Sequence, residues 1–207
     1  MTGASIYLNT PLSEADARSL QVGDEVYLSG RVLAMCYPWQ FIKMLDLRRA
    51  GKPLPIEMQG GVVYHCPASY VESEQGYRIR FVGATTSSKF NQWTPALIRE
   101  FGIRGVIGKG GMDLRTLDAF RECGAVYFAA VGGCSALYTK GVASVVREIW
   151  PQPSRSDNVL ELELRGFGPL LVAMDSHGRS LYEDVRRSSV QRLNEMLRAL
   201  VKIDTPS

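Results

Sequence analysis

The sequence predicts an α/β domain with a mixed central sheet, and three observations lead to that prediction. Two short apolar strand patterns, 103–107 and 125–131, alternate with helix patterns that begin near Thr94 and Leu114. Such alternation is typical of a sheet with crossover helices. Strand-like segments also dominate the first half and the end of the chain. The length of 207 residues, with 45% apolar and 22% charged residues, suits one substantial core. We therefore expect a single domain over residues 1–207.

Several strands are expected in the first half of the chain. The segment 21–35 alternates apolar and polar residues, and a Ser-Gly pair at 29–30 is typical of a turn that interrupts it. A helix is expected over 40–49, followed by a proline-rich break. Further strands are expected at 62–64 and 77–82, and the second of these leads directly into a polar loop.

The middle of the chain has the clearest helix boundaries. Thr94 followed by Pro95 is typical of an N-cap and a first helical position, and Gly102 provides the stop. A second helix is expected over 114–123, closed by Gly124. Crossover helices favour parallel pairing of the strands around them. The loops that follow such strands lie at one edge of the sheet, where ligands usually bind.

The end of the chain is expected to close the domain. Strands are expected at 160–164 and 170–174, followed by a turn and a terminal helix over 188–201. The apolar residues of this helix follow helical spacing: Val190, Leu193, Leu197, Leu200 and Val201. We expect this apolar face to dock on the core, and docking on a partner is the alternative.

The composition excludes several classes of protein. A net charge of +3 is too small to argue for nucleic acid. No apolar run reaches the length of a membrane span, and the N-terminus lacks the pattern of a secretory signal. The four cysteines lie far apart without a CxxC pair, and the only histidines are His65 and His177. This argues against a zinc site or a disulfide framework. We expect a cytoplasmic protein that binds neither nucleic acid nor membrane and holds no metal.

Two loops that follow expected strands are the candidates for chemistry. The sequence GATTSSK occupies 83–89, and IGKGGM occupies 107–112. Backbone N–H groups, lysines and hydroxyls suit anionic oxygens, so we expect a carboxylate or phosphate pocket. Neither a Walker A spacing nor a dinucleotide-binding G-x-G-x-x-G is present. The candidate substrate-binding residues are Thr86, Ser87, Lys89, Gly110 and Gly111.

Several motifs together resemble one known family. They occur in the family's order and with similar spacing: VGDEVYLSGRVL (22–33), VGATTSSK (82–89), VIGKGGM (106–112), VGGCSAL (131–137) and FGPLLVAMDSHG (167–178). The chain resembles the β subunit of the two-subunit iron–sulfur tartrate dehydratases and class I fumarases. This subunit is also the C-terminal domain of the single-chain fumarases.

The resemblance implies a swivelling β/β/α domain that acts as one component of a hydro-lyase. In that family the β part closes over a [4Fe-4S] cluster held by cysteines of an α part, and the cluster's open iron acts as a Lewis acid on the departing hydroxyl. By motif match, Thr85 falls on the threonine that abstracts the proton, and Lys109 falls on the active-site lysine. A threonine hydroxyl is a useful base only beside a cation, and Lys109 is placed to supply one.

The resemblance also implies the cofactor and the partners. This chain would bind no cofactor itself, and the [4Fe-4S] cluster would belong to an α-type partner. The substrate would be a small carboxylic acid. A homo-oligomer is the alternative to pairing with an α-type chain.

Two departures from the family pattern fall where substrate is bound. The family carries an Arg-Asp-x-x-His stretch where this chain has residues 36–40, and an arginine where this chain has Lys89. Only arginine holds a carboxylate through two parallel hydrogen bonds, so the substrate clamps are altered. Cys36 is either a buried thiol or a catalytic thiol that acts as nucleophile or acid.

Three functions follow from these features. The first is a hydro-lyase β-type subunit that adds or eliminates water on a hydroxy-carboxylic acid. The second is a stand-alone enzyme of the same fold that acts without a cluster on a larger or less charged substrate. The third is a non-catalytic subunit that binds a partner or an anion.

Overall fold

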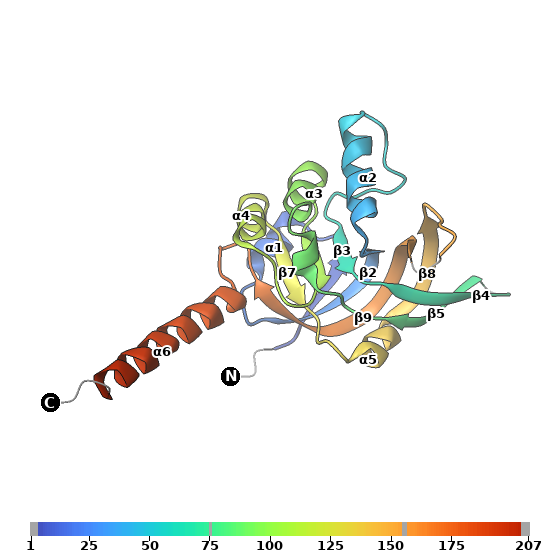
Figure 1. The fold of residues 1–207 in the computed structure, drawn as a ribbon. Helices are drawn as coiled ribbons and strands as arrows, with labels where there is room; N and C mark the ends of the chain where they lie inside the picture. Colours follow the sequence, from blue (N-terminus) through green and yellow to red (C-terminus); the bar gives the residue numbers. More distant parts are fainter. Residues whose placement is uncertain (1–3, 75, 155–156, 204–207) are drawn as a thin grey trace.

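A mixed seven-stranded sheet forms the centre of the molecule (Figure 1). The computed structural model describes residues 4–74, 76–154 and 157–203. The strands of the sheet are β1 (Ile6–Thr10), β2 (Glu25–Met35), β3 (Val62–His65), β6 (Gly105–Gly108), β7 (Val126–Ala129), β8 (Val142–Ile149) and β9 (Val159–Met174). A separate two-stranded ribbon consists of β4 (Ala68–Ser73) and β5 (Gly76–Val82). The helices are α1 (Glu14–Ser19), α2 (Pro38–Arg49), α3 (Thr94–Phe101), α4 (Leu114–Cys123), α5 (Ser135–Lys140) and α6 (Leu181–Ile203), with a short 3-10 helix η1 (Ser87–Phe90).

The sheet closes on itself through its longest strand. β1, β2, β3, β6 and β7 pair in parallel, in that order. β9 runs antiparallel to β7, β8 and β2. Because β9 bonds to both β7 and β2, the strands β2-β3-β6-β7-β9 form a closed ring. The predicted α/β fold with a mixed central sheet is therefore confirmed, as is the parallel pairing around the crossover helices.

Two apolar clusters lie on the two sides of this ring. Along β3, Tyr64 belongs to a cluster that is built mainly from sheet residues, whereas Val63 belongs to a cluster shared with α2, α3 and α4. Phe128 and Tyr127 divide in the same way on β7. Alternate residues of a strand point to opposite faces, so the first cluster fills the ring and the second joins it to the helices. Figure 1 shows α2, α3 and α4 together on one side of the sheet.

Three local predictions about strand and helix boundaries are wrong. The pair at 29–30 does not end a strand: β2 continues through it, since Gly30 adopts a φ of 96° at a bulge against β9. Thr94 is not an N-cap but lies inside α3, where its hydroxyl donates to the Phe90 carbonyl over 3.0 Å. The two strands expected after residue 160 are one continuous strand, β9.

The C-terminal helix differs most from the prediction. α6 begins at Leu181 rather than at residue 188, and it projects away from the sheet (Figure 1). The apolar residues Val190, Leu193, Leu197 and Leu200 are 48–58% exposed. Docking of this face on the core is therefore wrong, because only the first turn of α6 packs on the body. The side chain of Val201 lies outside the described part of the chain. Neither α6 nor any other described helix combines the length and apolarity that crossing a membrane requires.

Candidate functional site

The backbones of the two candidate loops are joined directly. Thr86 and Lys109 form a parallel bridge. Around it, the Ser87 N–H donates to the Lys109 carbonyl over 3.0 Å, and the Lys109 N–H donates to the Thr85 carbonyl over 3.2 Å. The Thr85 N–H donates to the carbonyl of His65, at the end of β3, over 2.8 Å. The segment 85–87 thus extends the sheet at the carboxyl ends of β3 and β6.

This pairing uses three of the backbone N–H groups in the two loops. Those of Thr85, Ser87 and Lys109 are engaged within the protein, so they are not free to bind an anion. Anion binding by the other N–H groups of the loops stays a prediction.

A hollow of about 360 Å³ opens beside the paired loops. Thr85, Thr86, Lys89 and Lys109 all line it. Its other lining residues are small or apolar: Pro67, Phe81, Gly83, Ala84 and Gly133. Among these lining residues there is no acidic side chain, so two ammonium groups and two hydroxyls face the space. Such a set of groups suits a small molecule that carries anionic oxygens.

The side chain of Lys109 passes close to the loop after β7. A Cβ atom at Gly132 would lie 3.4 Å from Lys109 Cδ and 3.7 Å from its Nζ. These are ordinary van der Waals distances, so the side chain of Lys109 runs alongside the loop after β7.

A buried polar cluster of His65, Ser87 and Tyr127 holds the first loop against the sheet. The Ser87 hydroxyl lies 2.9 Å from His65 Nδ1 and accepts a hydrogen bond of 2.9 Å from the Tyr127 hydroxyl. All three side chains are fully buried. Burial lowers the pKa of His65 to about 3, so the imidazole stays neutral at physiological pH. A Cβ atom at Gly108 would collide with the Ser87 hydroxyl, which explains the first glycine of the GKGG motif.

Three of the predicted substrate-binding residues are not among those that line the hollow. The hydroxyl of Ser87 is already engaged by His65 and Tyr127. Gly110 has a φ of 78°, and Gly111, with a φ of 72°, packs directly under the ring of Tyr182. Both glycines shape the loop that presents Lys109. Substrate contact by these three residues stays a prediction.

Cys36 follows β2 and is partly buried. Burial and, to a smaller extent, the charge of Asp157 raise the pKa of its thiol to about 12, against the opposing charge of Lys89. The thiolate is therefore disfavoured at neutral pH, which argues for the buried-thiol interpretation. Cys36 is not among the residues that line the hollow, and its catalytic role stays a prediction.

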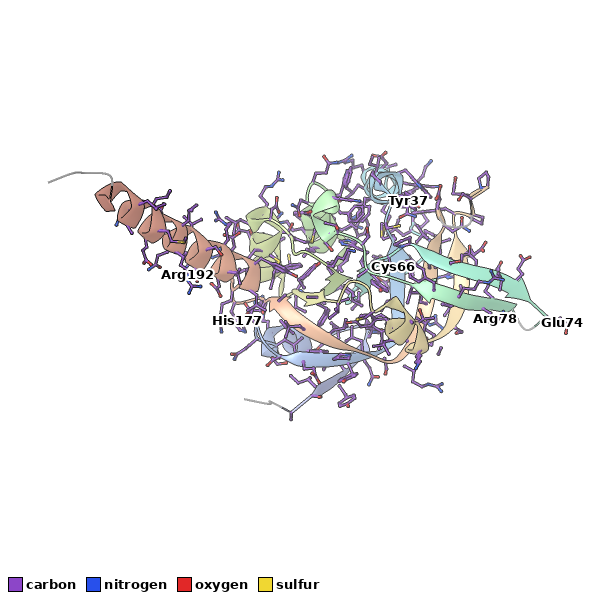
Figure 2. All side chains as sticks on the ribbon, turned by 60° about the horizontal axis from the view of Figure 1, so that its bottom comes forward. Tyr37, Cys66, Glu74, Arg78, His177 and Arg192 are labelled. Carbon is purple, nitrogen blue, oxygen red and sulfur yellow. The ribbon has the colours of Figure 1, made fainter. Side chains whose placement is uncertain are left out.

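Cys66 lies within the body, close to the loops (Figure 2). Its sulfur accepts a hydrogen bond of 3.2 Å from the Gly83 N–H. Burial raises the pKa of this thiol to about 12. The side chain fixes the start of the first loop and behaves as a packing residue.

The described residues do not fit an iron–sulfur cluster. Within them, no group of three or more His, Cys, Asp or Glu side chains lies together as a metal would require. We therefore derive no step of the reaction from a cluster held by this chain.

The fold and the hollow define a class of protein. It is a mixed α/β domain in which two lysines and two threonines line a hollow at the carboxyl ends of parallel strands. Among the supporting residues, sequence reasoning missed Tyr127 and left His65 open, because neither stands in a recognisable motif.

Comparison with known proteins identifies the family. The family model described as "Fumarase C-terminus" matches residues 2–185. The "Putative L(+)-tartrate dehydratase subunit beta" of Methanocaldococcus jannaschii is 33% identical over 192 residues, which are 92% of this chain and 98% of that protein. The chain belongs to this family, a family of hydro-lyases, and the resemblance seen in the motifs is confirmed.

Two further relatives show both arrangements of the domain. The "L(+)-tartrate dehydratase subunit beta" of Escherichia coli K12 is 26% identical over 185 residues, 89% of this chain and 90% of that subunit. The "Putative fumarate hydratase class I" of Geobacillus stearothermophilus is 31% identical over 191 residues, 92% of this chain but only 36% of that protein. The domain therefore occurs both as a separate subunit and as part of a longer chain.

Proposed function

We propose that this chain is the β-type component of a hydro-lyase that adds water to, or eliminates it from, a hydroxy-carboxylic acid. One observation carries the proposal: Thr85 and Lys109, which match the family's motifs, line one hollow and come from loops joined backbone to backbone. The names of the relatives support the reaction class, since each is a dehydratase or a hydratase.

The residues that line the hollow have two proposed roles, substrate binding and proton transfer. Lys89 and Lys109 attract the carboxylates of the substrate. In the elimination direction, the Thr85 oxygen takes the proton from carbon as its own hydroxyl proton passes to water, and hydroxide leaves the adjacent carbon; the ammonium of Lys109 stabilises the negative charge that develops on the Thr85 oxygen. In the addition direction it returns that proton. Ser87, His65 and Tyr127 hold the first loop in place and keep this side of the site dry.

The departure of the hydroxyl is assigned to a second chain. An α-type partner would hold the [4Fe-4S] cluster, which supplies Lewis-acid chemistry to the leaving hydroxyl. Support for a partner comes from the relatives named as β subunits and from the absence of a cluster donor set among the described residues.

The substrate is proposed to differ from those of the relatives. Lys89 is a compact point charge where the resemblance implies an arginine, and Cys36 with Tyr37 replaces a charged stretch. Loss of a bidentate clamp weakens the hold on a second carboxylate. We propose a hydroxy-carboxylic acid that is larger or less charged than tartrate.

Reconstitution tests the proposal. The chain is purified alone and together with an α-type iron–sulfur chain from the same organism, and both samples are assayed anaerobically for hydration and dehydration of a panel of hydroxy-carboxylic acids. Turnover only by the pair is expected. Turnover by this chain alone in a sample free of iron supports the stand-alone enzyme instead. Ligand-induced thermal stabilisation without turnover in either sample supports the binding subunit.

A further inference from the structure

α6 is a long helix of which only the beginning is packed. It has 23 residues, and Tyr182 in its first turn lies over Gly111 and 6.2 Å from the ring of Tyr127. Every residue from Asp184 to Leu200 is exposed. Figure 2 shows Arg192 on the helix well away from the body that contains Cys66. The first turn of the helix is thus fixed against the body, and residues 184–200 are exposed.

The exposed part of α6 carries an apolar stripe on one face. Val190, Leu193, Leu197 and Leu200 are spaced by three, four and three residues, and Met196 lies beside them at 62% exposure. This spacing is the a and d pattern of a coiled-coil seam over two heptads. The family model matches residues 2–185, so the stripe lies beyond the matched residues.

The stripe is complementary to itself. If two copies of the helix cross antiparallel with Glu195 at the centre, Val190 faces Leu200 and Leu193 faces Leu197. The positions that flank the seam near its centre are Asn194 and Met196, which are uncharged. Between Val190 and Leu200, the charged residues occupy heptad positions that face away from the seam: Arg192, Glu195 and Arg198. An antiparallel pair therefore brings no like charges together on the seam.

Parallel pairing is less favourable on electrostatic grounds. It would place the acidic first turns, with Glu183 and Asp184, beside each other and align the two helix dipoles. Antiparallel pairing separates the acidic turns and opposes the dipoles. We propose that α6 is a dimerisation helix that pairs antiparallel with α6 of a second copy of this chain through Val190, Leu193, Leu197 and Leu200. The pairing does not depend on the proposed enzymatic function.

Sedimentation of the full chain without any α-type chain tests the pairing. At tens of micromolar the wild type sediments as a dimer, and Leu193→Asp/Leu197→Asp sediments as a monomer. The matched control Gln191→Asp/Ala199→Asp adds the same charge on the outward face and stays dimeric. Thermal unfolding of the body is unchanged in both variants, which shows that the difference is not a loss of folding. A monomeric wild type, or a dimer that survives the leucine substitutions, overturns the proposal.

A cross-link tests the orientation. Residue 194 flanks the seam at its centre, so its two copies meet in an antiparallel pair and lie on opposite sides of a parallel one. Oxidised Asn194→Cys is expected to run as a covalent dimer on a non-reducing gel, whereas the oxidised wild type, with its four native cysteines, does not. A dimer in solution that fails to cross-link contradicts the antiparallel arrangement. A stripe that becomes protected only when an α-type chain is added contradicts self-pairing altogether.

Discussion

The paired loops and α6 differ in how far the rest of the protein supports them. The loops at 85–89 and 109–111 are held by backbone hydrogen bonds and by a fully buried cluster beneath them. The exposed part of α6 has no such support, although it carries six large apolar side chains. The loops belong to the part of the chain that the family shares, and the apolar stripe lies beyond it. The proposed reaction site thus lies within the residues that the family model matches, and the proposed dimerisation stripe lies outside them.

The largest expected effect follows from removing the charge of Lys109. Lys109→Met should lower kcat of the reconstituted enzyme by about 10²–10³-fold, or roughly 2.7–4 kcal/mol, because a cation that stabilises developing negative charge is lost. Steady-state kinetics and a thermal unfolding curve measure activity and folding separately. Lys52→Met, an exposed lysine in another loop, is the control and should keep wild-type kcat. Near-normal turnover by Lys109→Met would show that this loop is not the active site.

A methyl group at Gly108 tests the rigidity of the loop pair. Gly108→Ala forces a Cβ against the Ser87 hydroxyl and should destabilise the protein by up to about 3 kcal/mol, the cost of overpacking a filled core. Urea unfolding measures the loss. In a Ser87→Ala background the hydroxyl is gone, so the same glycine substitution should cost less. Equal costs in the two backgrounds would mean that Ser87 does not lie against Gly108.

The buried imidazole predicts how stability depends on pH. The pKa of His65 is lowered to about 3 from 6.5, so its contribution to stability is complete above pH 6.5 and is lost as pH falls. Between pH 6.5 and 5 the free energy of unfolding should fall by about 1.6 kcal/mol, with a slope that approaches roughly 1.4 kcal/mol per pH unit at the lower end of this range. Denaturant titrations at several pH values measure this slope.

His177 provides a matched control for this pH dependence of the free energy of unfolding. His65→Gln should remove the fall, and the exposed His177→Gln should leave it in place. The carboxyl groups with lowered pKa values, such as Glu14 and Asp16, ionise below this window and do not contribute to it. A fall of equal size in His65→Gln would assign the effect to other groups.

The smallest effect is expected on α6. Val185 is 64% exposed, so Val185→Ala should change the free energy of unfolding of the body by no more than about 0.5 kcal/mol. Chemical denaturation followed by tryptophan fluorescence reports on the body, because no tryptophan lies in α6. A loss above 1 kcal/mol would show that the helix packs on the body after all.

The sequence could predict the elements with strong local signals. Glycine and proline positions predicted α3 and α4 to within a residue or so, and the motifs located Thr85 and Lys109. The sequence could not predict that His65 and Tyr127 meet at Ser87, since these residues come from β3, β7 and η1, and only the order of strands in the sheet brings them together. The apolar face of α6 was visible in the spacing, but spacing does not say what covers a face.

The central claim is that the Thr85 oxygen handles the carbon-bound proton, and proton exchange tests it most directly. The reconstituted enzyme is incubated with its substrate in deuterated water, and loss of the carbon-bound proton signal is followed by NMR. Thr85→Val keeps the backbone bond to His65 and removes only the hydroxyl, so exchange should fall at least about 100-fold. Ser88→Ala, an exposed hydroxyl of the same loop, should exchange at the wild-type rate. Exchange at the wild-type rate in Thr85→Val would contradict the assignment.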